Sequence, residues 1–182
     1  MANMNKKTLW VTETAICIAL LVVLHAATAP LGNQLVTGSI VNLMLIISVM
    51  IGGYSSGLTV AVISPVVAKF LGLGPFWALI PFIAIGNAVL ITMWHVIAKR
   101  NFGPKYLPYI VALVAAALTK FAVLYLGVGK VAVPFILGLP EPQASVISGM
   151  FSIPQIFTAS IGGVIAILLV PALRKAIGKR QA

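Results

Sequence analysis

The sequence predicts an all-α membrane protein, a compact bundle of six transmembrane helices that forms a single domain over residues 1–182. Of the 182 residues, 61% are hydrophobic and only 8% are charged, which is too few charged residues to cover the surface of a soluble domain. The hydrophobic residues form long continuous blocks of the length that crosses a bilayer. The twelve basic residues, against two acidic ones, gather mostly at the ends of these blocks.

The first three hydrophobic blocks cover residues 9–29, 36–51 and 58–71. As a helix that rises about 1.5 Å per residue, the first block is long enough to cross a bilayer. It resembles a secretory signal, but Glu13 interrupts its start and Pro30 follows the only candidate cleavage site, so we expect a retained first span. The second and third blocks are short for full spans, and we expect a turn between them at the glycine- and serine-rich segment 52–57.

The last three blocks cover residues 76–98, 106–126 and 150–173. The basic segment 99–105 separates the fourth block from the fifth. We expect a long loop over 127–149, because its hydrophobic part, 131–137, is interrupted by Pro134 and is too short to span. This part is expected to pack on the outer face.

The charges predict the orientation, because an even number of spans places both ends of the chain on one side. That side would hold nine of the twelve basic residues, namely Lys6, Lys7, Lys99, Arg100, Lys105, Arg174, Lys175, Lys179 and Arg180. The other side would hold Lys69 and Lys130. The positive-inside rule then predicts both ends in the cytoplasm, and hence a multi-pass protein of the cell membrane. Nucleic-acid binding is disfavoured, because polar and aromatic residues are not interleaved with the basic ones.

A few polar side chains lie inside the blocks, where they must face protein, ligand or water. Lys120 is the most costly of them to place inside a membrane, because its side chain is charged. It either has a function or extends its ammonium group to the outer interface. Asn87 and Gln155 either join helices or bind a ligand, and for Asn42 a contact between helices is an equal interpretation. The small and polar face around Gln155 on the last span is expected to point inward.

Three prolines indicate a cavity near these polar residues. Pro65, Pro81 and Pro154 are expected to kink the third, fourth and sixth spans, all in their outer halves. A kink frees a backbone carbonyl, which lipid tolerates only where protein or a cavity satisfies it. We therefore expect a pocket that opens outward. Trp77 nearby would either line this pocket or anchor its helix at the membrane interface.

The sequence contains no set of residues suited to catalysis. No carboxylates pair at one membrane depth, and no phosphate-binding glycine loop or metal-ligand cluster is present. Cys17 is the one cysteine, so no disulfide framework can form. We therefore expect a ligand-binding protein that is not an enzyme, has no cofactor or metal of its own and takes its energy from elsewhere.

Several stretches resemble the substrate-binding S components of energy-coupling factor (ECF) transporters. Residues 15–19, AICIA, match the AxxxA motif of that family, and the similarity continues through 38–42, 63–65 and 81–87. The order of these stretches is most similar to that in the branch assigned to hydroxymethylpyrimidine or vitamin B6 (pyridoxine). The similarity extends over most of the chain. The resemblance implies a high-affinity vitamin-binding subunit of an ATP-driven importer, which topples in the membrane to deliver its substrate.

The resemblance also implies partners and site residues. A transmembrane coupling subunit would join this chain to two cytoplasmic ATPase subunits, which use the ATP. The coupling subunit would contact the small-residue stripe of the first span, formed by Thr12, Ala15, Ala19 and Ala26. The vitamin would bind among His25, Asn33, Gln34, Trp77, Asn87, Lys120, Tyr125 and Gln155.

The identity of the vitamin stays open. A neutral heteroaromatic ring suits stacking on Trp77 and hydrogen bonds from Asn87 and Gln155. Lys120 fits an anionic vitamin such as pantothenate at least as well. An autonomous secondary carrier is a further alternative.

Overall fold

A computed structural model describes residues 5–104 and 106–181, without the side chains of residues 174 and 177–181. Lys105 and the side chains of Arg174, Lys179 and Arg180, counted above among the basic residues of one side, therefore lie outside the description. The described part of the chain is 87% helix and contains no strand. Five helices are long and apolar enough to cross a membrane. The prediction of an all-α chain with several helices suited to cross a membrane is confirmed for the described residues, whereas six crossings and the orientation stay predictions.

The chain begins with two long helices joined by a short connection. Helix α1 (Lys6–Thr28) is followed by a 3₁₀ turn, η1 (Ala29–Leu31). Helix α2 (Gln34–Phe70) starts at Asn33, whose side-chain oxygen accepts hydrogen bonds from the backbone N–H groups of the first helical turn. Such a cap satisfies donors that have no partner within the helix.

Helix α2 spans 37 residues, but its backbone leaves helical geometry at Gly53, with φ 80° and ψ −178°. A Cβ atom added to Gly57 would lie only 2.8 Å from the Cβ atom of Val49. Residues eight positions apart in a straight helix are separated by about 12 Å along its axis. The two parts of α2 therefore fold back on each other, and the turn expected at segment 52–57 coincides with this reversal.

The second half of the chain forms a short lead-in and five further helical elements. They are η2 (Trp77–Leu79), α3 (Ile80–Ala98), α4 (Leu107–Leu124), the π-helix η3 (Tyr125–Leu137), α5 (Glu141–Met150) and α6 (Pro154–Gln181). The prediction of a long loop over 127–149 is wrong, because η3 continues α4 without a break. Its backbone groups bond within the π-helix, and Val128, Ala132 and Val133 are buried against Phe151.

Two of the three expected proline kinks are also wrong. Pro65 lies inside α2, but Pro81 occupies the first turn of α3 and Pro154 is the first residue of α6. The N–H groups of a first helical turn have no intrahelical acceptor, so proline is favoured there and bends nothing. These two prolines mark where helices begin.

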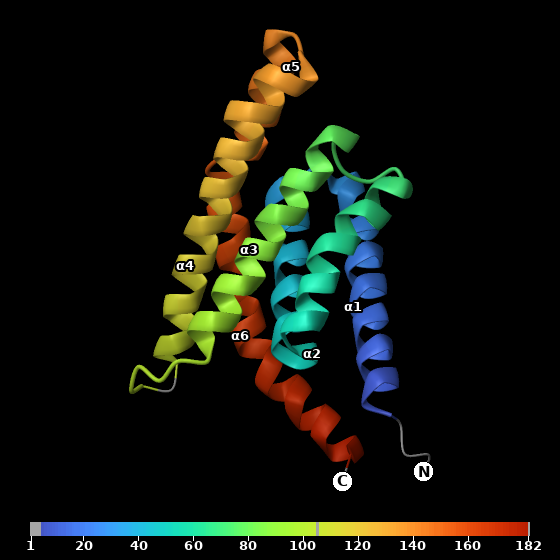
Figure 1. Ribbon diagram of the computed structural model, residues 1–182, viewed down its shortest axis with the longest axis vertical. Helices are drawn as coiled ribbons and strands as arrows, with labels where there is room; N and C mark the ends of the chain where they lie inside the picture. The colour runs from blue at the N-terminus through green and yellow to red at the C-terminus, as the bar shows by residue number, and fades with distance from the viewer. Residues whose placement is uncertain (1–4, 105, 182) are drawn as a thin grey trace.

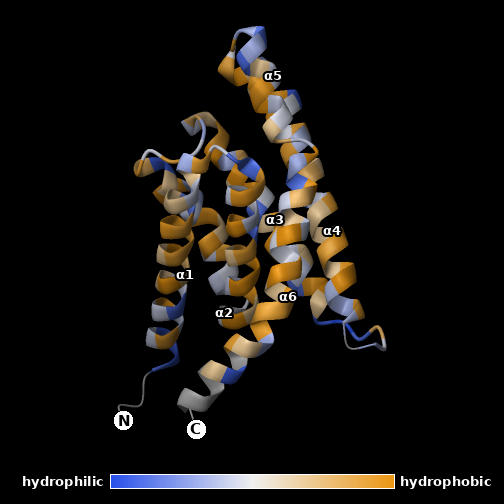
Figure 2. Ribbon diagram, turned by 180° about the vertical axis from the view of Figure 1, so that it is seen from behind, coloured by the Kyte–Doolittle hydropathy of each residue, from blue (hydrophilic) through white to orange (hydrophobic). Residues whose placement is uncertain are grey.

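The helices form one bundle in which α2 packs against α1, α3 and α6, and α4 packs against α3 and α6. Figure 1 shows that α1 begins and α6 ends at the same end of the molecule, where the α3–α4 connection also lies, whereas α5 projects from the opposite end. Hydrophobic residues follow the middle of the helices, and hydrophilic ones gather at the α3–α4 connection and the tip of α5 (Figure 2).

Two hydrophobic clusters hold the bundle. The larger contains Leu45, Leu90, Ile91 and Trp94, and the smaller surrounds Leu124 at the α5 end. Helices α2 and α6 approach each other closely at Gly162, where an added Cβ atom would lie 2.5 Å from the carbonyl oxygen of Ser39. Ala159, Gly162 and Ala166 are all buried, as expected for the inward face of the last span.

Candidate ligand-binding cavity

A cavity of about 350 Å³ lies at the end of the bundle opposite to the start of α1. Its walls come from the end of α1, the start of α2, the segment before α3, the upper part of α3, the end of α4 and the α5–α6 connection. Six of the eight predicted ligand-binding residues line it, namely His25, Asn33, Gln34, Asn87, Lys120 and Gln155. Its volume falls in the range of about 300–1,000 Å³ that is usual for small-molecule sites.

Lys120 is the central polar group of this cavity. Its side chain is only 3% exposed, and its Nζ atom donates hydrogen bonds to Oδ1 of Asn42 at 2.6 Å and to Oδ1 of Asn87 at 2.8 Å. The three side chains come from α4, α2 and α3. This buried set, the Lys120 triad, therefore joins three helices at the cavity wall.

The two asparagine side chains are themselves held by further hydrogen bonds. Nδ2 of Asn42 donates to the hydroxyl of Thr158 on α6 at 3.1 Å, and Nδ2 of Asn87 donates to the carbonyl of Ala61 at 3.5 Å. Because each amide nitrogen is engaged elsewhere, each amide oxygen faces Lys120. The ammonium group is thus fixed in position before any ligand arrives.

Two glutamine amides lie at the mouth of the cavity and share one acceptor. Nε2 of Gln34 donates to the carbonyl oxygen of Met150, and Nε2 of Gln155 donates to the same oxygen at 3.0 Å. Gln34 belongs to the first turn of α2 and Gln155 to the first turn of α6, whereas Met150 ends α5. These bonds hold the α5–α6 connection against the start of α2.

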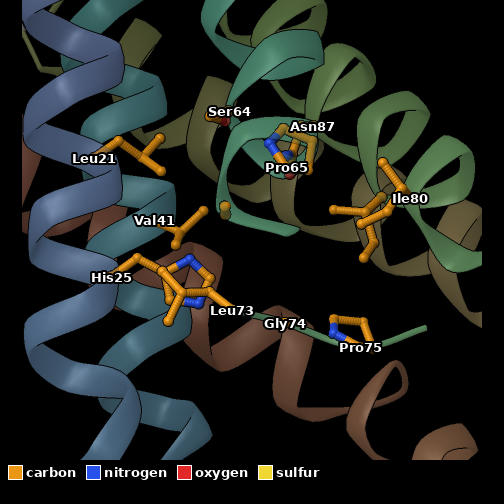
Figure 3. A pocket seen from close by; sticks show the side chains of 12 residues that line it. Leu21, His25, Val41, Ser64, Pro65, Leu73, Gly74, Pro75, Ile80 and Asn87 are labelled. Atoms are coloured by element: carbon orange, nitrogen blue, oxygen red, sulfur yellow. The ribbon is translucent and has the colours of Figure 1, made fainter. Parts of the chain in front are cut away.

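A smaller cavity of about 70 Å³ adjoins the first and shares His25 and Asn87 with it. Figure 3 shows these two side chains at its border, His25 from α1 and Asn87 from α3, with the Leu73–Pro75 segment beside them. Most of its other lining residues are hydrophobic, among them Leu21, Val41 and Ile80. A ligand in the larger cavity therefore has a hydrophobic recess next to the Lys120 triad.

Trp77 and Tyr125, the other two predicted ligand-binding residues, lie outside both cavities. The Trp77 ring is 50% exposed and packs edge-on against Phe70 at 4.9 Å, which suits the interfacial anchor that the sequence left as an alternative. The Tyr125 ring stacks on Phe121 at 5.6 Å, with Nζ of Lys130 lying 5.4 Å from its centre.

The predicted partner-binding stripe lies on an exposed face of α1. Thr12, Ala15, Ala19 and Ala26 are all exposed, and Val11, Ile16 and Val23 beside them are at least half exposed. The hydroxyl of Thr12 bonds within its own helix, to the carbonyl of Thr8 at 2.9 Å. This face is available to lipid or to another helix.

Sequence reasoning missed the part that Asn42 plays in the cavity. From the sequence a contact between helices is an equal interpretation for Asn42, so it is not among the predicted ligand-binding residues. It does bond to Thr158 of α6, but it also lines the cavity and accepts from Lys120. The feature that could have identified Asn42 is its place inside a hydrophobic block, because Asn87 was identified from the same feature in another block.

The arrangement is suited to binding a polar small molecule within a hydrophobic bundle, through a fixed ammonium group, amides and a histidine. Comparison of the chain with models of protein families, with curated proteins and with solved structures found no match.

Proposed function

We propose that this protein is a membrane-embedded small-molecule receptor that acts as the substrate-binding S component of an ATP-driven ECF importer. The observation that carries the proposal is the cavity itself. A buried lysine and two buried asparagines line a space of about 350 Å³ in an otherwise hydrophobic bundle. Desolvated polar groups of this kind are costly in a membrane and mark functional sites there. The choice of the S-component family rests on the stretches of sequence that resemble S components.

The proposal includes six crossings with both ends of the chain in the cytoplasm. The reversal at Gly53 supports six, because it divides α2 into two arms of roughly 25–29 Å each at 1.5 Å per residue. Each arm is close to the thickness of the hydrocarbon core, about 30 Å. Lys6, Lys99 and Arg100 lie at the end where α1 begins, which by the positive-inside rule is cytoplasmic. The cavity then opens to the outside of the cell membrane.

Cysteine labelling tests this orientation. In a Cys17→Ser background, a membrane-impermeant maleimide added to whole cells should label Glu141→Cys and leave Lys99→Cys unlabelled. Glu141 is the exposed first residue of α5 and Lys99 is exposed after α3, at the other end of the bundle. Labelling of Lys99→Cys from outside would reverse the orientation, and labelling of both positions would refute the topology.

The proposed ligand is a small vitamin or vitamin precursor. Hydroxymethylpyrimidine and pyridoxine are favoured by the resemblance, and pantothenate is the alternative that Lys120 suggests. Asn87 and Gln155 would bind ring nitrogens or hydroxyl groups, and the hydrophobic recess beside His25 would hold an apolar part of the molecule.

The proposed partners are a transmembrane coupling subunit and two cytoplasmic ATPases that use the ATP, so that the chain itself is not an enzyme. The exposed small-residue stripe of α1 would contact the coupling subunit, because small side chains allow helices in a membrane to approach closely. Toppling of the bundle would then carry the cavity from the outer to the inner side.

The test begins with the chain purified from cells grown in rich medium, and with mass spectrometry of the small molecules that it retains. The retained compound is then titrated calorimetrically against Asn87→Leu and Gln155→Leu, with Asn101→Leu as the control, because Asn101 is exposed after α3. We expect both cavity variants to bind at least roughly ten-fold more weakly, which is about 1.4 kcal/mol, and the control to bind normally. Unchanged affinity in both cavity variants, or no retained compound at all, would refute the proposed site.

Reconstituted vesicles separate an S component from an autonomous carrier. Uptake that requires the coupling and ATPase subunits together with ATP supports the proposal. Uptake by this chain alone, abolished by an uncoupler, would instead support a secondary carrier.

A further inference from the structure

We infer that the ligand of the larger cavity carries an anionic group, such as a carboxylate, that binds the ammonium group of Lys120. The inference rests on the proposed function, in that it assumes that this cavity holds a small molecule. It names the chemical class of that molecule from the charges around the cavity, and so selects the anionic alternative over the neutral vitamins that the resemblance favours.

The ammonium group of Lys120 has one hydrogen-bond donor left over. A lysine has three N–H donors, and two of those of Lys120 are used, by Oδ1 of Asn42 and by Oδ1 of Asn87. Among the described residues no third acceptor lies within hydrogen-bond distance, and the side chain lines the cavity. The remaining donor is therefore available to a molecule inside it.

The positive charge of Lys120 has no acidic partner in the cavity wall. The chain contains only two acidic side chains, Glu13 and Glu141. A carboxylate oxygen of Glu13 lies 4.0 Å from the Cβ position of Gly52, beside the reversal of α2, and Glu141 is exposed at the start of α5. Neither lines the cavity. The two asparagines that accept from Lys120 are neutral.

A buried charge without a counter-charge is costly. The effective penalty for desolvating one ion inside a protein is several kcal/mol, even after relaxation. Two amide oxygens stabilise the ammonium group by hydrogen bonding but do not neutralise it. A ligand carboxylate or similar oxyanion at the third donor would supply both the acceptor and the opposite charge, and such charge-assisted bonds are about twice as strong as neutral ones.

The remaining polar groups of the cavity indicate how such a ligand lies. His25, Gln34 and Gln155 also line the cavity and are only partly buried, and Asn33, which lines it too, is exposed. These groups suit hydroxyl or amide functions. The ligand therefore places its anionic end against Lys120, deep in the bundle, and a neutral polar end near the α5–α6 connection.

The test uses pairs of compounds that differ only in the charged group. Pantothenate is compared with pantothenol, and 4-pyridoxate with pyridoxine, so that each carboxylate is matched by the corresponding alcohol. Both pairs are titrated calorimetrically against the purified full-length protein in the same detergent. The net charge of any compound that co-purifies from rich medium is determined by ion exchange and mass spectrometry.

We expect the co-purified compound to be an anion, and the acid of at least one pair to bind at least ten-fold more tightly than its alcohol. Lys120→Met should lose this preference. Lys130→Met should keep it, because Lys130 is exposed and lies outside the cavity. If Lys120→Met does not fold, the comparison of acid with alcohol in the unaltered protein decides the question by itself.

The remaining outcomes overturn the inference in distinguishable ways. Retention of a neutral compound, or equal or tighter binding of the alcohols, would refute an anionic ligand. An acid preference that survives Lys120→Met would refute Lys120 as the group that binds the anion. Each of these outcomes leaves the proposed binding function standing. Retention of no compound, together with no binding of either pair, would refute the proposed function and the inference together.

Discussion

Replacement of Asn42 by leucine tests the Lys120 triad most directly. The substitution removes the oxygen that accepts from Lys120 at 2.6 Å and the N–H that donates to Thr158 at 3.1 Å. A hydrogen bond to a charged group contributes about 1.5–3 kcal/mol, and a neutral one between membrane helices about 0.6 kcal/mol. We therefore expect Asn42→Leu to lower the free energy of unfolding by about 2–4 kcal/mol. At about 2–4 °C per kcal/mol for a chain of this length, the melting temperature falls by roughly 4–16 °C.

A double-mutant cycle with Lys120→Met then isolates the bond between the two residues. Much of the loss in Asn42→Leu comes from a charge left with one acceptor, so removing that charge as well should restore part of the stability. The coupling energy should exceed about 1.7 kcal/mol, the largest value found for hydrogen bonds between helices of a membrane protein. All four proteins are unfolded thermally in one detergent, with tryptophan fluorescence, to which the buried Trp94 contributes, as the signal. Additive losses, with a coupling energy below about 0.6 kcal/mol, would show that the lysine does not depend on Asn42.

Three further substitutions test other features of the fold and of the proposed partner face. Gly53→Ala should destabilise the protein by about 1–3 kcal/mol, because φ 80° with ψ −178° is strained for any residue with a Cβ atom; an unchanged melting temperature would refute the sharp reversal of α2. Gly162→Ala should cost about 1–3 kcal/mol through overpacking against Ser39, whereas Gly149→Ala, whose Cβ atom meets open space, should leave thermal stability equal or higher. The double variant Ala15→Trp and Ala19→Trp should abolish ATP-driven uptake in reconstituted vesicles and leave calorimetric ligand affinity unchanged, and normal uptake would exclude this face as the partner contact.

Much of the architecture follows from features that the sequence displays directly. The hydrophobic blocks correspond to helices because bilayer thickness and backbone hydrogen bonding restrict such blocks to that form. Segment 52–57 was predictable as a turn because glycine, as at Gly53, can adopt backbone conformations that residues with a Cβ atom rarely adopt. Lys120 and Asn87 were identifiable because polar groups inside a hydrophobic block require a partner.

Other features depend on contacts that block length does not reveal. Segment 127–149 was expected to be a loop because 131–137 is too short to span by itself, but η3 continues α4, and a segment that continues an existing helix needs no minimum length of its own. Pro81 and Pro154 were expected to bend helices because the exact start of a helix cannot be located within a hydrophobic block, and a shift of a few residues decides whether a proline is tolerated. Trp77 and Tyr125 were placed near the ligand by position along the chain, which does not determine where a side chain points.

The carbonyl oxygen of Met150 holds two glutamines from two different helices. Displacement of this one oxygen would leave the N–H groups of both glutamines without their acceptor. Because both glutamines line the cavity, the position of a single backbone oxygen decides whether two amide groups bond to the protein or are free to bind a ligand.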